Sequence, residues 1–326
     1  MPHWYEEIKI LKEKMGRWKK LIVHGKHDLF FISYLKSKYM KIAVIINPES
    51  GKGKGEKFFK KIEKLYSDNP SIEFFLTERP LHAVEISKNV SNYKKIIICG
   101  GDGTLHEVIN GFDLNSDAIL GLIPIGSGND FSLSFHKTKT DPLALFEYYL
   151  TENPKIRPVN FGETKIIDSK GNEFNNRLIN SFGVGFDAKV AYYNQNNKVL
   201  SGTMSYITAV LKSLVEFSHV DFEANIDGNK VSGNALFCAV GNGQSIGGGL
   251  YLMPNAKVDD NLLDLSVVSI KSRFKLLTLL PKAISNTLTS RKELKQYSFV
   301  NLKIYLNMLK INNVGRTLWP YQLYCQ

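Results

Sequence analysis

The chain has 326 residues, a length typical of two domains or of one large domain. Hydrophobic residues make up 43% of it and charged residues 22%, which supports a packed core and excludes a largely disordered chain. The formal net charge of +11 favours anionic partners: phosphate-bearing small molecules, an anionic membrane surface or nucleic acid.

The cysteines and the apolar runs indicate the compartment. Cys99, Cys238 and Cys325 lie far apart and match no metal-binding spacing, so we expect neither a disulfide framework nor a zinc site. Reduced thiols fit a cytoplasmic protein. No apolar run approaches the roughly 18 residues of a membrane span, and charges interrupt the first 20 residues, which excludes a secretory signal. Any membrane contact is therefore predicted to be peripheral, at the inner face of the membrane.

Residues 1–39 form a basic extension with an apolar stripe at helical spacing. The stripe consists of Trp4, Ile8, Leu11, Met15, Trp18 and Ile22. Three interpretations remain open: an amphipathic anchor on anionic lipid, a helix packed on the main body, or upstream sequence translated ahead of a true start at Met40.

Residues 40–155 alternate between short β-branched runs and helical stretches. The expected strands are Lys41–Ile46, Ile72–Leu76, Lys95–Cys99 and Ile119–Pro124, and the expected helices are Glu56–Tyr66, Ala83–Asn89 and Thr104–Asn110. This alternation predicts an α/β domain with a parallel sheet and helices on its faces. Ligands of such folds bind beyond the carboxyl ends of the strands.

Residues 156–326 are predicted to form a second, β-rich domain, and the boundary is expected within Thr151–Pro158. The expected strands are Glu173–Phe186, Val220–Ile226, Val231–Val240 and Leu263–Ile270, with turns at Asp168–Gly171 and Asp227–Asn229 and helices near Asp187–Asn194 and Met204–Phe217.

The most informative segment is Lys95–Phe112, in which a buried strand enters the turn Gly100–Gly103 and a helix follows. Glycines let the backbone approach a polyphosphate closely, and the N–H groups at a helix start bind it. Asp102 has two possible roles: a carboxylate facing the magnesium that accompanies a nucleotide, or a helix cap in a tight turn.

Two more strands end in turns of the same kind. Lys41–Ile46 runs into the glycine-rich stretch Asn47–Gly55, and Ile119–Pro124 runs into Ile125–Asp130. The first is not a Walker A loop, because the required Gly-Lys-Ser/Thr is missing. Three such turns at one edge of one sheet predict a phosphate-binding site.

These segments resemble a known family. The motifs NPESGKG, GGDGTLHEVINGF and PIGSGNDF, with later blocks at 180–188 and 247–264, are similar to the bacterial lipid kinases of the diacylglycerol kinase and sphingosine kinase superfamily. The resemblance covers about residues 40–304. It implies an NAD kinase/diacylglycerol kinase-like α/β domain followed by a β-sandwich-like domain, with ATP bound in the cleft between them.

The resemblance also implies individual site residues. The ATP-binding positions are Asn47, Pro48, Glu49, Ser50, Gly51, Thr77, Gly100, Gly101, Asp102, Gly103, Thr104, Leu105, His106 and Ser127. The implied Mg²⁺ ligands are the carbonyls of Lys257 and Leu262 and the carboxylate of Asp260. Asn261 stands where the family has glycine, a mild departure because asparagine tolerates left-handed backbone.

The C-terminus departs from the family pattern. The family carries a D-G-E type segment whose carboxylate is held to be the base for the lipid hydroxyl, and the local counterpart here places Val314 and Arg316 at the two acidic positions. Neither side chain accepts a proton at neutral pH. The chain also stops at Gln326, earlier than the family's terminal strands and helix would, and an altered reading frame would explain both features.

The sequence thus predicts an ATP- and Mg²⁺-dependent lipid kinase, with Asp102 as the catalytic carboxylate and diacylglycerol as the expected acceptor. The expected partners are a membrane lipid substrate and an anionic membrane surface; nucleic acid is not expected, and a homodimer is left open. One alternative is a catalytically impaired nucleotide or lipid binder, motivated by Val314 and Arg316. NAD kinase is a weaker alternative, as is a dinucleotide fingerprint at Gly183–Ala188, where Asp187 is interpreted as structural or a helix cap.

Overall fold

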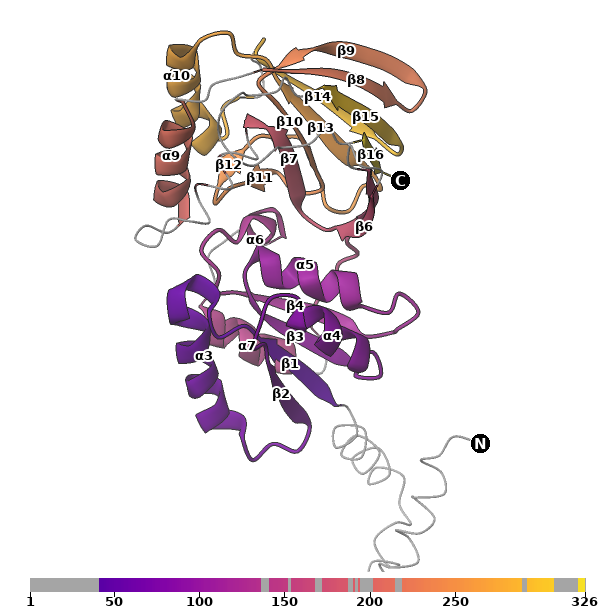
Figure 1. Cartoon of the computed structure of the whole chain (residues 1–326). Helices are drawn as coiled ribbons and strands as arrows, with labels where there is room; N and C mark the ends of the chain where they lie inside the picture. The colour runs from indigo at the N-terminus through magenta and orange to yellow at the C-terminus, as the bar shows by residue number, and fades with distance from the viewer. Residues whose placement is uncertain are drawn as a thin grey trace, which may run out of the picture.

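A computed structural model describes residues 41–135, 141–151, 154–167, 172–186, 190, 193, 202–214, 219–288, 292–307 and 322–325. The first described domain contains a parallel four-stranded sheet in the order β2-β1-β3-β4 (Figure 1). Its strands are β1 (Ile42–Ile46), β2 (Ile72–Leu76), β3 (Lys95–Gly100) and β4 (Ile119–Pro124). The helices are α3 (Ser50–Tyr66), α4 (His82–Asn89), α5 (Asp102–Gly111), α6 (Asp130–Phe135) and α7 (Pro142–Leu150).

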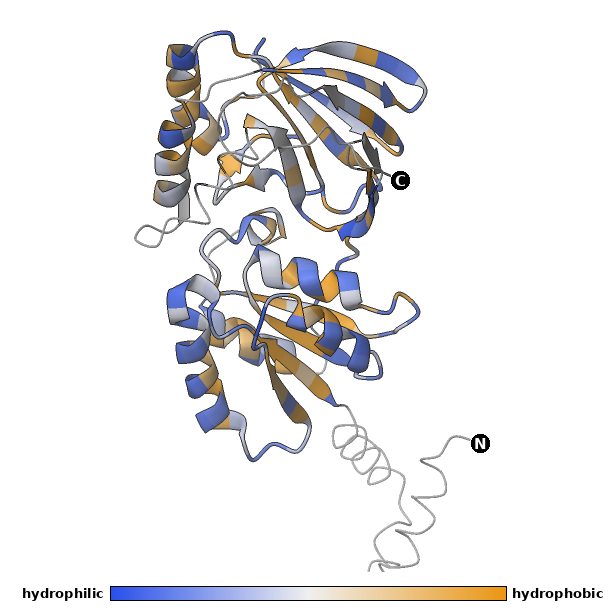
Figure 2. Ribbon diagram, viewed as in Figure 1, coloured by the Kyte–Doolittle hydropathy of each residue, from blue (hydrophilic) through white to orange (hydrophobic). Residues whose placement is uncertain are grey.

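Both faces of this sheet are covered, as its unbroken β-branched strands require. Every residue of β1 and β3 is buried, and the strands are the most apolar part of the domain (Figure 2). Ala43 and Ile45 face α4 and α5 in one core cluster, whereas Val44 and Ile46 face α3 and α7 in another. The predicted α/β fold class is confirmed.

The described residues of the second domain form two large antiparallel sheets, one two-stranded sheet and two long helices. The four-stranded sheet has the order β14-β13-β10-β7, the six-stranded sheet has the order β6-β5-β16-β15-β8-β9, and β11 pairs with β12. The strands are β5 (Gly162–Ile167), β6 (Glu173–Leu178), β7 (Ser181–Gly185), β8 (Val220–Ile226), β9 (Asn229–Ala235), β10 (Phe237–Gly241), β11 (Ser245–Ile246), β12 (Leu250–Tyr251), β13 (Leu263–Val268), β14 (Leu294–Phe299), β15 (Leu302–Asn307) and β16 (Gln322–Cys325). The helices are α9 (Gly202–Ser213) and α10 (Arg273–Ile284).

The two sheets of this domain enclose one core, and the helices cover a second. Cys238 and Val240 of β10 point into the core shared with the six-stranded sheet. Phe237 and Ala239 of the same strand point to the other face, where α9 and α10 pack. This alternation is the period-2 pattern of a strand buried on both faces.

Two expected strands are divided in the structure. Val231–Val240 was expected to be one strand, but it forms β9 and β10, which lie in different sheets and are separated by Leu236. Ala235 and Cys238 point into the same core although they are three residues apart, so the alternation slips by one residue where the chain changes sheet. Glu173–Phe186 is likewise divided into β6 and β7, because Ile179 between them packs into the core of the first domain.

Other expectations had mixed outcomes. The turn at Asp227–Asn229 is confirmed as the β8–β9 hairpin, with Asp227 and Gly228 both at positive φ. Residues 1–39, the turn at 168–171, Asp187 and most of the helix expected at 187–194 lie outside the described residues. The domain boundary near residue 155 stays a prediction. Within the described part of the chain, no helix combines the length and hydropathy needed to cross a membrane.

One joint connects the end of α5 to the second domain. The Asn110 side chain accepts a hydrogen bond from the Arg177 backbone N–H (2.8 Å) and donates one to the Arg177 carbonyl (3.0 Å). The Arg177 guanidinium donates to the carbonyls of Ile109 and Phe112, which α5 leaves open at its end. The amide of Asn110 therefore pairs with β6 as the backbone of a neighbouring strand would.

We expect Asn110→Ala to lower the melting temperature and to reduce the free energy of unfolding by about 1–3 kcal/mol. The substitution removes the side chain that pairs with both the N–H and the carbonyl of Arg177. Asn234→Ala is the control, since it removes one exposed hydrogen bond to Asp221. Thermal unfolding monitored by circular dichroism compares the two variants. Equal melting temperatures would show that the joint does not contribute to stability.

Candidate functional site

Three turns meet where β1, β3 and β4 end. The strands are neighbours in the sheet, so their carboxyl ends lie side by side, and backbone hydrogen bonds join the turns that follow them. The Asn47 N–H donates to the Cys99 carbonyl and the Ile125 N–H donates to the Gly100 carbonyl, both at 3.0 Å. The Asn47 side chain also donates to the Thr104 hydroxyl at 3.1 Å. The predicted convergence of the glycine-rich turns is therefore present.

The turns approach each other so closely that side chains would not fit between them. A Cβ at Gly126 would lie 2.4 Å from the Gly101 Cα, and one at Gly51 would lie 2.2 Å from the Ile125 carbonyl oxygen. Gly51, Lys52 and Gly53 all have positive φ, so α3 begins with a loop rather than a regular first turn. Backbone N–H groups in such turns form concavities that bind anions.

The Asp102 carboxylate caps a helix, although not its own. Its two oxygens accept the backbone N–H groups of Asp130 and Phe131, each at 2.9 Å, at the start of α6. The helix that Asp102 itself begins has Gly101 at its N-cap, without a capping side chain. Of the two roles considered for Asp102, capping is therefore observed, and the remaining lone pairs of the carboxylate leave metal binding as a prediction.

Asp130 connects this cluster to the second domain, a role that sequence reasoning missed. Its carboxylate accepts the backbone N–H groups of Gly248 (2.7 Å) and Gly249 (2.8 Å), and the Ser245 hydroxyl donates to its carbonyl (3.2 Å). Only 5% of Asp130 is exposed. Burial, together with the nearby Asp102 carboxylate, raises the pKa of Asp130 to about 6. The sequence feature that could have indicated this contact is the triple glycine Gly247–Gly249, because all three residues have positive φ in the structure.

The residues implied as ATP contacts do not all lie in the same surroundings. Ser127 and Glu49 are exposed beside the turns, and Ser50 is buried at the start of α3. Leu105 packs in the core of the first domain, so its side chain has a structural role. His106 is half-buried on α5, and burial lowers its pKa. Sequence motifs thus mix side chains that face the turns with side chains that hold the helix in place.

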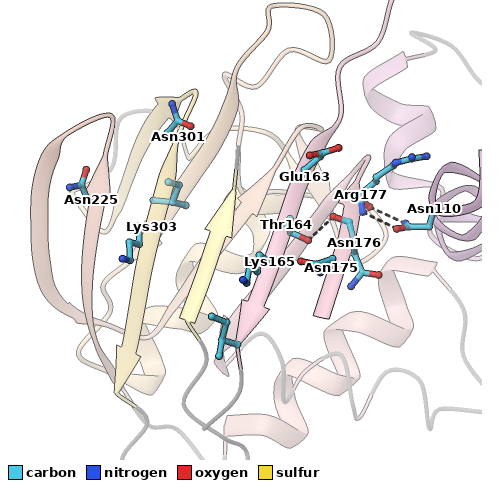
Figure 3. A pocket seen from close by; sticks show the side chains of 12 residues that line it. Asn110, Glu163, Thr164, Lys165, Asn175, Asn176, Arg177, Asn225, Asn301 and Lys303 are labelled. Carbon is cyan, nitrogen blue, oxygen red and sulfur yellow. Dashed lines mark hydrogen bonds between the residues drawn. The ribbon is translucent and has the colours of Figure 1, made fainter. Parts of the chain in front are cut away.

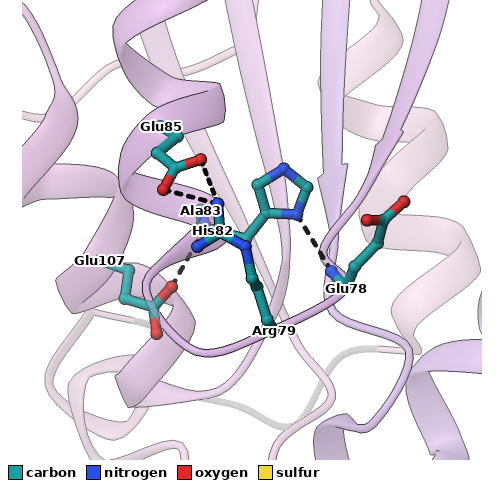
Figure 4. Close-up of polar contacts among 6 residues, drawn as sticks. All are labelled: Glu78, Arg79, His82, Ala83, Glu85 and Glu107. Atoms are coloured by element: carbon teal, nitrogen blue, oxygen red, sulfur yellow. Dashed lines mark hydrogen bonds and ion pairs between the residues drawn. The ribbon is translucent and has the colours of Figure 1, made fainter.

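Thr77 lies one strand further along the same edge of the sheet. Its N–H donates to the Ile46 carbonyl at 2.8 Å, which fixes the end of β2 beside the end of β1. Figure 4 shows the chain that follows: the Glu78 N–H donates to the His82 ring, and Arg79 forms an ion pair with Glu85 at 2.6 Å. The Ala83 N–H donates to the Glu107 carboxylate at 3.2 Å, which ties α4 to α5.

The implied magnesium ligands lie on one loop between β12 and β13. Asn261 has a φ of 63°, the left-handed conformation expected there. The Asp260 carboxylate accepts the Leu262 N–H at 3.0 Å. A carboxylate and two carbonyls are oxygen ligands of the kind that Mg²⁺ accepts, so the residues fit. Within the described residues no cluster of three or more His, Cys, Asp or Glu side chains could hold a metal, and this loop stays a prediction.

Two carboxylates beside the glycine turns also fit a cation. A Cβ built on Gly128 would lie 3.3 Å from one oxygen of Asp102 and 3.3 Å from one oxygen of Asp130. The two carboxylates therefore flank the same residue, and the Asp102 carboxylate contributes to the raised pKa of Asp130. A bound cation would reduce the repulsion between them, so the two carboxylates are electrostatically compatible with a metal.

A wide cavity in the described part of the chain lies away from the glycine turns. It has a volume of about 820 Å³ and extends along the six-stranded sheet to the end of α5 (Figure 3). Its lining is polar and includes Lys165, Arg177, Lys303 and Asn110, but no residue of the three glycine turns. A second cavity of about 330 Å³ lies along β4 and is mostly apolar. Neither cavity was predicted, because residues from distant strands line both.

The fold is therefore that of a two-domain protein, with a parallel sheet that gathers glycine-rich turns at one edge and a β-sandwich-like domain hydrogen-bonded to them. Residues 41–163 match the diacylglycerol kinase catalytic domain, and residues 180–312 match the YegS C-terminal NAD kinase beta sandwich-like domain. The chain belongs to this kinase family. The predicted resemblance and the predicted β-sandwich-like second domain are thereby confirmed. Val314 and Arg316 lie outside the described residues.

Named relatives support the same assignment. YtlR of Bacillus subtilis, named as a candidate lipid kinase, is 30% identical over 241 residues, which cover 69% of this chain and 76% of that protein. A diacylglycerol kinase of Staphylococcus aureus (strain MRSA252) is 29% identical over 234 residues, 69% of each chain. A crystal structure of a diacylglycerol kinase from Bacillus anthracis has a TM-score of 0.63 at 22% identity, covering 88% of this chain and 94% of that chain, and shows the same fold.

We expect Gly126→Ala to weaken nucleotide binding and to destabilise the protein by about 1–3 kcal/mol, because the added methyl group would push the Gly101 turn away. Gly233→Ala on β9 is the control, since its Cβ would meet Phe222 only at 3.4 Å. Thermal shift with and without ATP separates the two effects. An unchanged ATP-induced shift in Gly126→Ala would contradict the close-approach argument.

The raised pKa of Asp130 predicts a pH-dependent stability. Its folded-state value of about 6 exceeds the roughly 3.9 of an unfolded chain, so the folded protein holds a proton that the unfolded chain releases. This contribution, at most about 3 kcal/mol, is complete below about pH 4 and is lost as the pH rises through 6. Denaturant unfolding from pH 4 to pH 7.5, in the absence of metal, should show the decline in the native protein and in an Asp117→Asn control. Asp130→Asn should lack it, and an identical profile in all three would refute the assignment.

Proposed function

We propose that the protein is an ATP-dependent lipid kinase that transfers the γ-phosphoryl group of ATP to a hydroxyl of a membrane lipid, with diacylglycerol as the first candidate acceptor. The observation that carries the proposal is the convergence of three glycine-rich turns at adjacent strand ends, joined through Asn47 and Thr104 at 3.1 Å. Membership of the diacylglycerol kinase catalytic domain family and the named relatives support it.

In this proposal the turns bind the triphosphate. The backbone N–H groups at Gly51–Gly53 and at the start of α5 supply partial positive charge, and the absence of side chains lets the phosphates approach. Asn47, Ser50, Thr77 and Ser127 complete the nucleotide contacts that the family resemblance implies. Positioning and charge neutralisation carry most of phosphoryl transfer, so a rigid set of donors is the main requirement.

Mg²⁺, when bound, would neutralise part of the negative charge of the triphosphate. We propose that the carboxylates of Asp102 and Asp130, which flank Gly128, face this ion. Lys257, Asp260 and Leu262 are the second proposed set of ligands, in the loop before β13. Asp102 also holds the first amides of α6, so its charge and its position are needed together.

The acceptor and the setting are proposals of the same kind. A cytoplasmic enzyme with a net charge of +11 would meet its lipid at the inner face of an anionic membrane, where each lysine or arginine near the surface contributes about 1 kcal/mol. Phosphorylation of diacylglycerol would place it in phospholipid metabolism.

A second candidate, a nucleotide binder with impaired turnover, is favoured by Val314 and Arg316 at the positions of the family's acidic residues. A general base typically contributes about 10²–10⁴ in rate, so its loss would slow the reaction without preventing ATP binding. This candidate requires an ATP-induced thermal shift without labelled product. The double variant Val314→Asp, Arg316→Glu should then restore turnover.

The deciding experiment is transfer of ³²P from ATP to a bacterial lipid extract, with NAD as a competing acceptor. We expect labelled lipid from the native chain and at least a 100-fold loss in Asp102→Asn, because the amide offers one acceptor oxygen where α6 and the metal need two. Asp113→Asn, at an exposed turn, is the matched control and should keep its activity. Labelled NAD phosphate without labelled lipid would replace the lipid kinase proposal.

A further inference from the structure

The outer surface of α9 and α10 carries a concentration of exposed apolar side chains. Both helices cover the same face of the four-stranded sheet, on the side of the second domain away from β8 and β9 (Figure 1). We call their solvent-facing side the α9–α10 face. Its exposed apolar residues are Met204 and Leu211 on α9 and Phe274, Leu277 and Ile284 on α10.

α10 has two apolar stripes, one that packs on the sheet and a second that is exposed. Leu276, Leu279 and Ala283 are buried against the sheet and complete the core cluster. On the opposite side, Phe274 is 81% exposed, and Leu277 and Ile284 follow three and ten residues later, which keeps them on one side of the helix. A surface helix of a monomer normally presents polar residues there. An apolar stripe of this kind marks a surface that binds something apolar.

The charge of the same face has only one sign. Neither α9 nor α10 contains an aspartate or glutamate, whereas Lys212, Arg273, Lys275 and Lys282 lie on them and Lys271 just precedes α10. Lys275 reaches Glu293 at 3.0 Å, outside the helices. Apolar tips flanked by lysine and arginine are the pattern of helices that lie in the interface of an anionic bilayer.

We propose that the α9–α10 face docks on the surface of an anionic lipid bilayer, with Phe274 and Leu277 inserted at the boundary between headgroups and acyl chains. This inference rests on the proposed lipid kinase function, since it names the surface through which such an enzyme would reach its acceptor. The argument for a bilayer rather than a second copy is electrostatic. A two-fold dimer through this face would bring two exclusively basic helix pairs together, which is unfavourable.

The face is also connected to the candidate site. α10 packs on β12, whose Leu250 belongs to the same core cluster. β12 directly follows Gly248 and Gly249, which donate to Asp130 beside the glycine turns. Docking would therefore hold the lipid surface against the domain that contacts the phosphate-binding turns.

The experiment is sedimentation with vesicles of phosphatidylcholine alone or with an equal part of phosphatidylglycerol, without ATP. We expect the full chain to bind the anionic vesicles and the double variant Phe274→Ser, Leu277→Ser to bind about tenfold more weakly. Phe174→Ser is the matched control, because Phe174 is 51% exposed on β6, away from this face, and the variant should bind like the native chain. Arg273→Gln with Lys282→Gln should also reduce binding, and more at low than at high salt.

Several outcomes would overturn the proposal: no binding of the native chain to anionic vesicles, equal loss in Phe174→Ser, or a change of oligomeric state in Phe274→Ser, Leu277→Ser by light scattering, which would make the face an interface between copies. Phosphorylation of a short-chain, water-soluble diacylglycerol separates this proposal from the function it rests on. The double variant should phosphorylate that acceptor as the native chain does. If neither phosphorylates it while vesicle binding follows the expected pattern, the kinase proposal fails and the docking face stands.

Discussion

The arrangement of the candidate site depends on a short relay of carboxylate–amide hydrogen bonds. Asp102, inside the turn after β3, holds the first two amides of α6, and Asp130 at that same helix start holds two amides of the triple-glycine turn. The Asp102 side chain thus fixes the backbone at the start of α6, and the Asp130 side chain fixes the backbone of the triple-glycine turn. Because each bond has a charged or partly charged acceptor, it is stronger than an ordinary backbone hydrogen bond. The relay links the triple-glycine turn of the second domain to the glycine-rich turns that follow β3 and β4.

The same relay lowers the stability of the folded protein, and this disadvantage is informative about function. The buried Asp130 carboxylate lies beside the partly buried Asp102 carboxylate, and a protein selected for stability alone would replace one of them by a neutral group. Gly126 and Gly51 add to that cost, since glycine loses more backbone freedom on folding than any other residue. Such local disadvantages gather where an anion or a metal must approach backbone and carboxylates together.

The sequence predicted the local elements well and the long-range ones poorly. The bounds of Ile72–Leu76, Ile119–Pro124 and Val220–Ile226 agree residue for residue, because each is a short apolar or alternating run between turn residues. The division of Val231–Val240 was missed, since the residue pattern continues while the chain changes sheet. The turns were found from their glycines, but the partner of Asp102 was not, because a cap on a helix 28 residues away leaves no local signal.

The joint at Asn110 has a mechanical consequence. α5 has ten residues, about 15 Å of rigid rod, with the glycine turn at one tip and the paired amide of Asn110 at the other. The segment Gly100–Asn110 therefore spans from the glycine turn after β3 to the six-stranded sheet. A displacement of β6 would therefore be transmitted along α5 to the glycine turn at its other end.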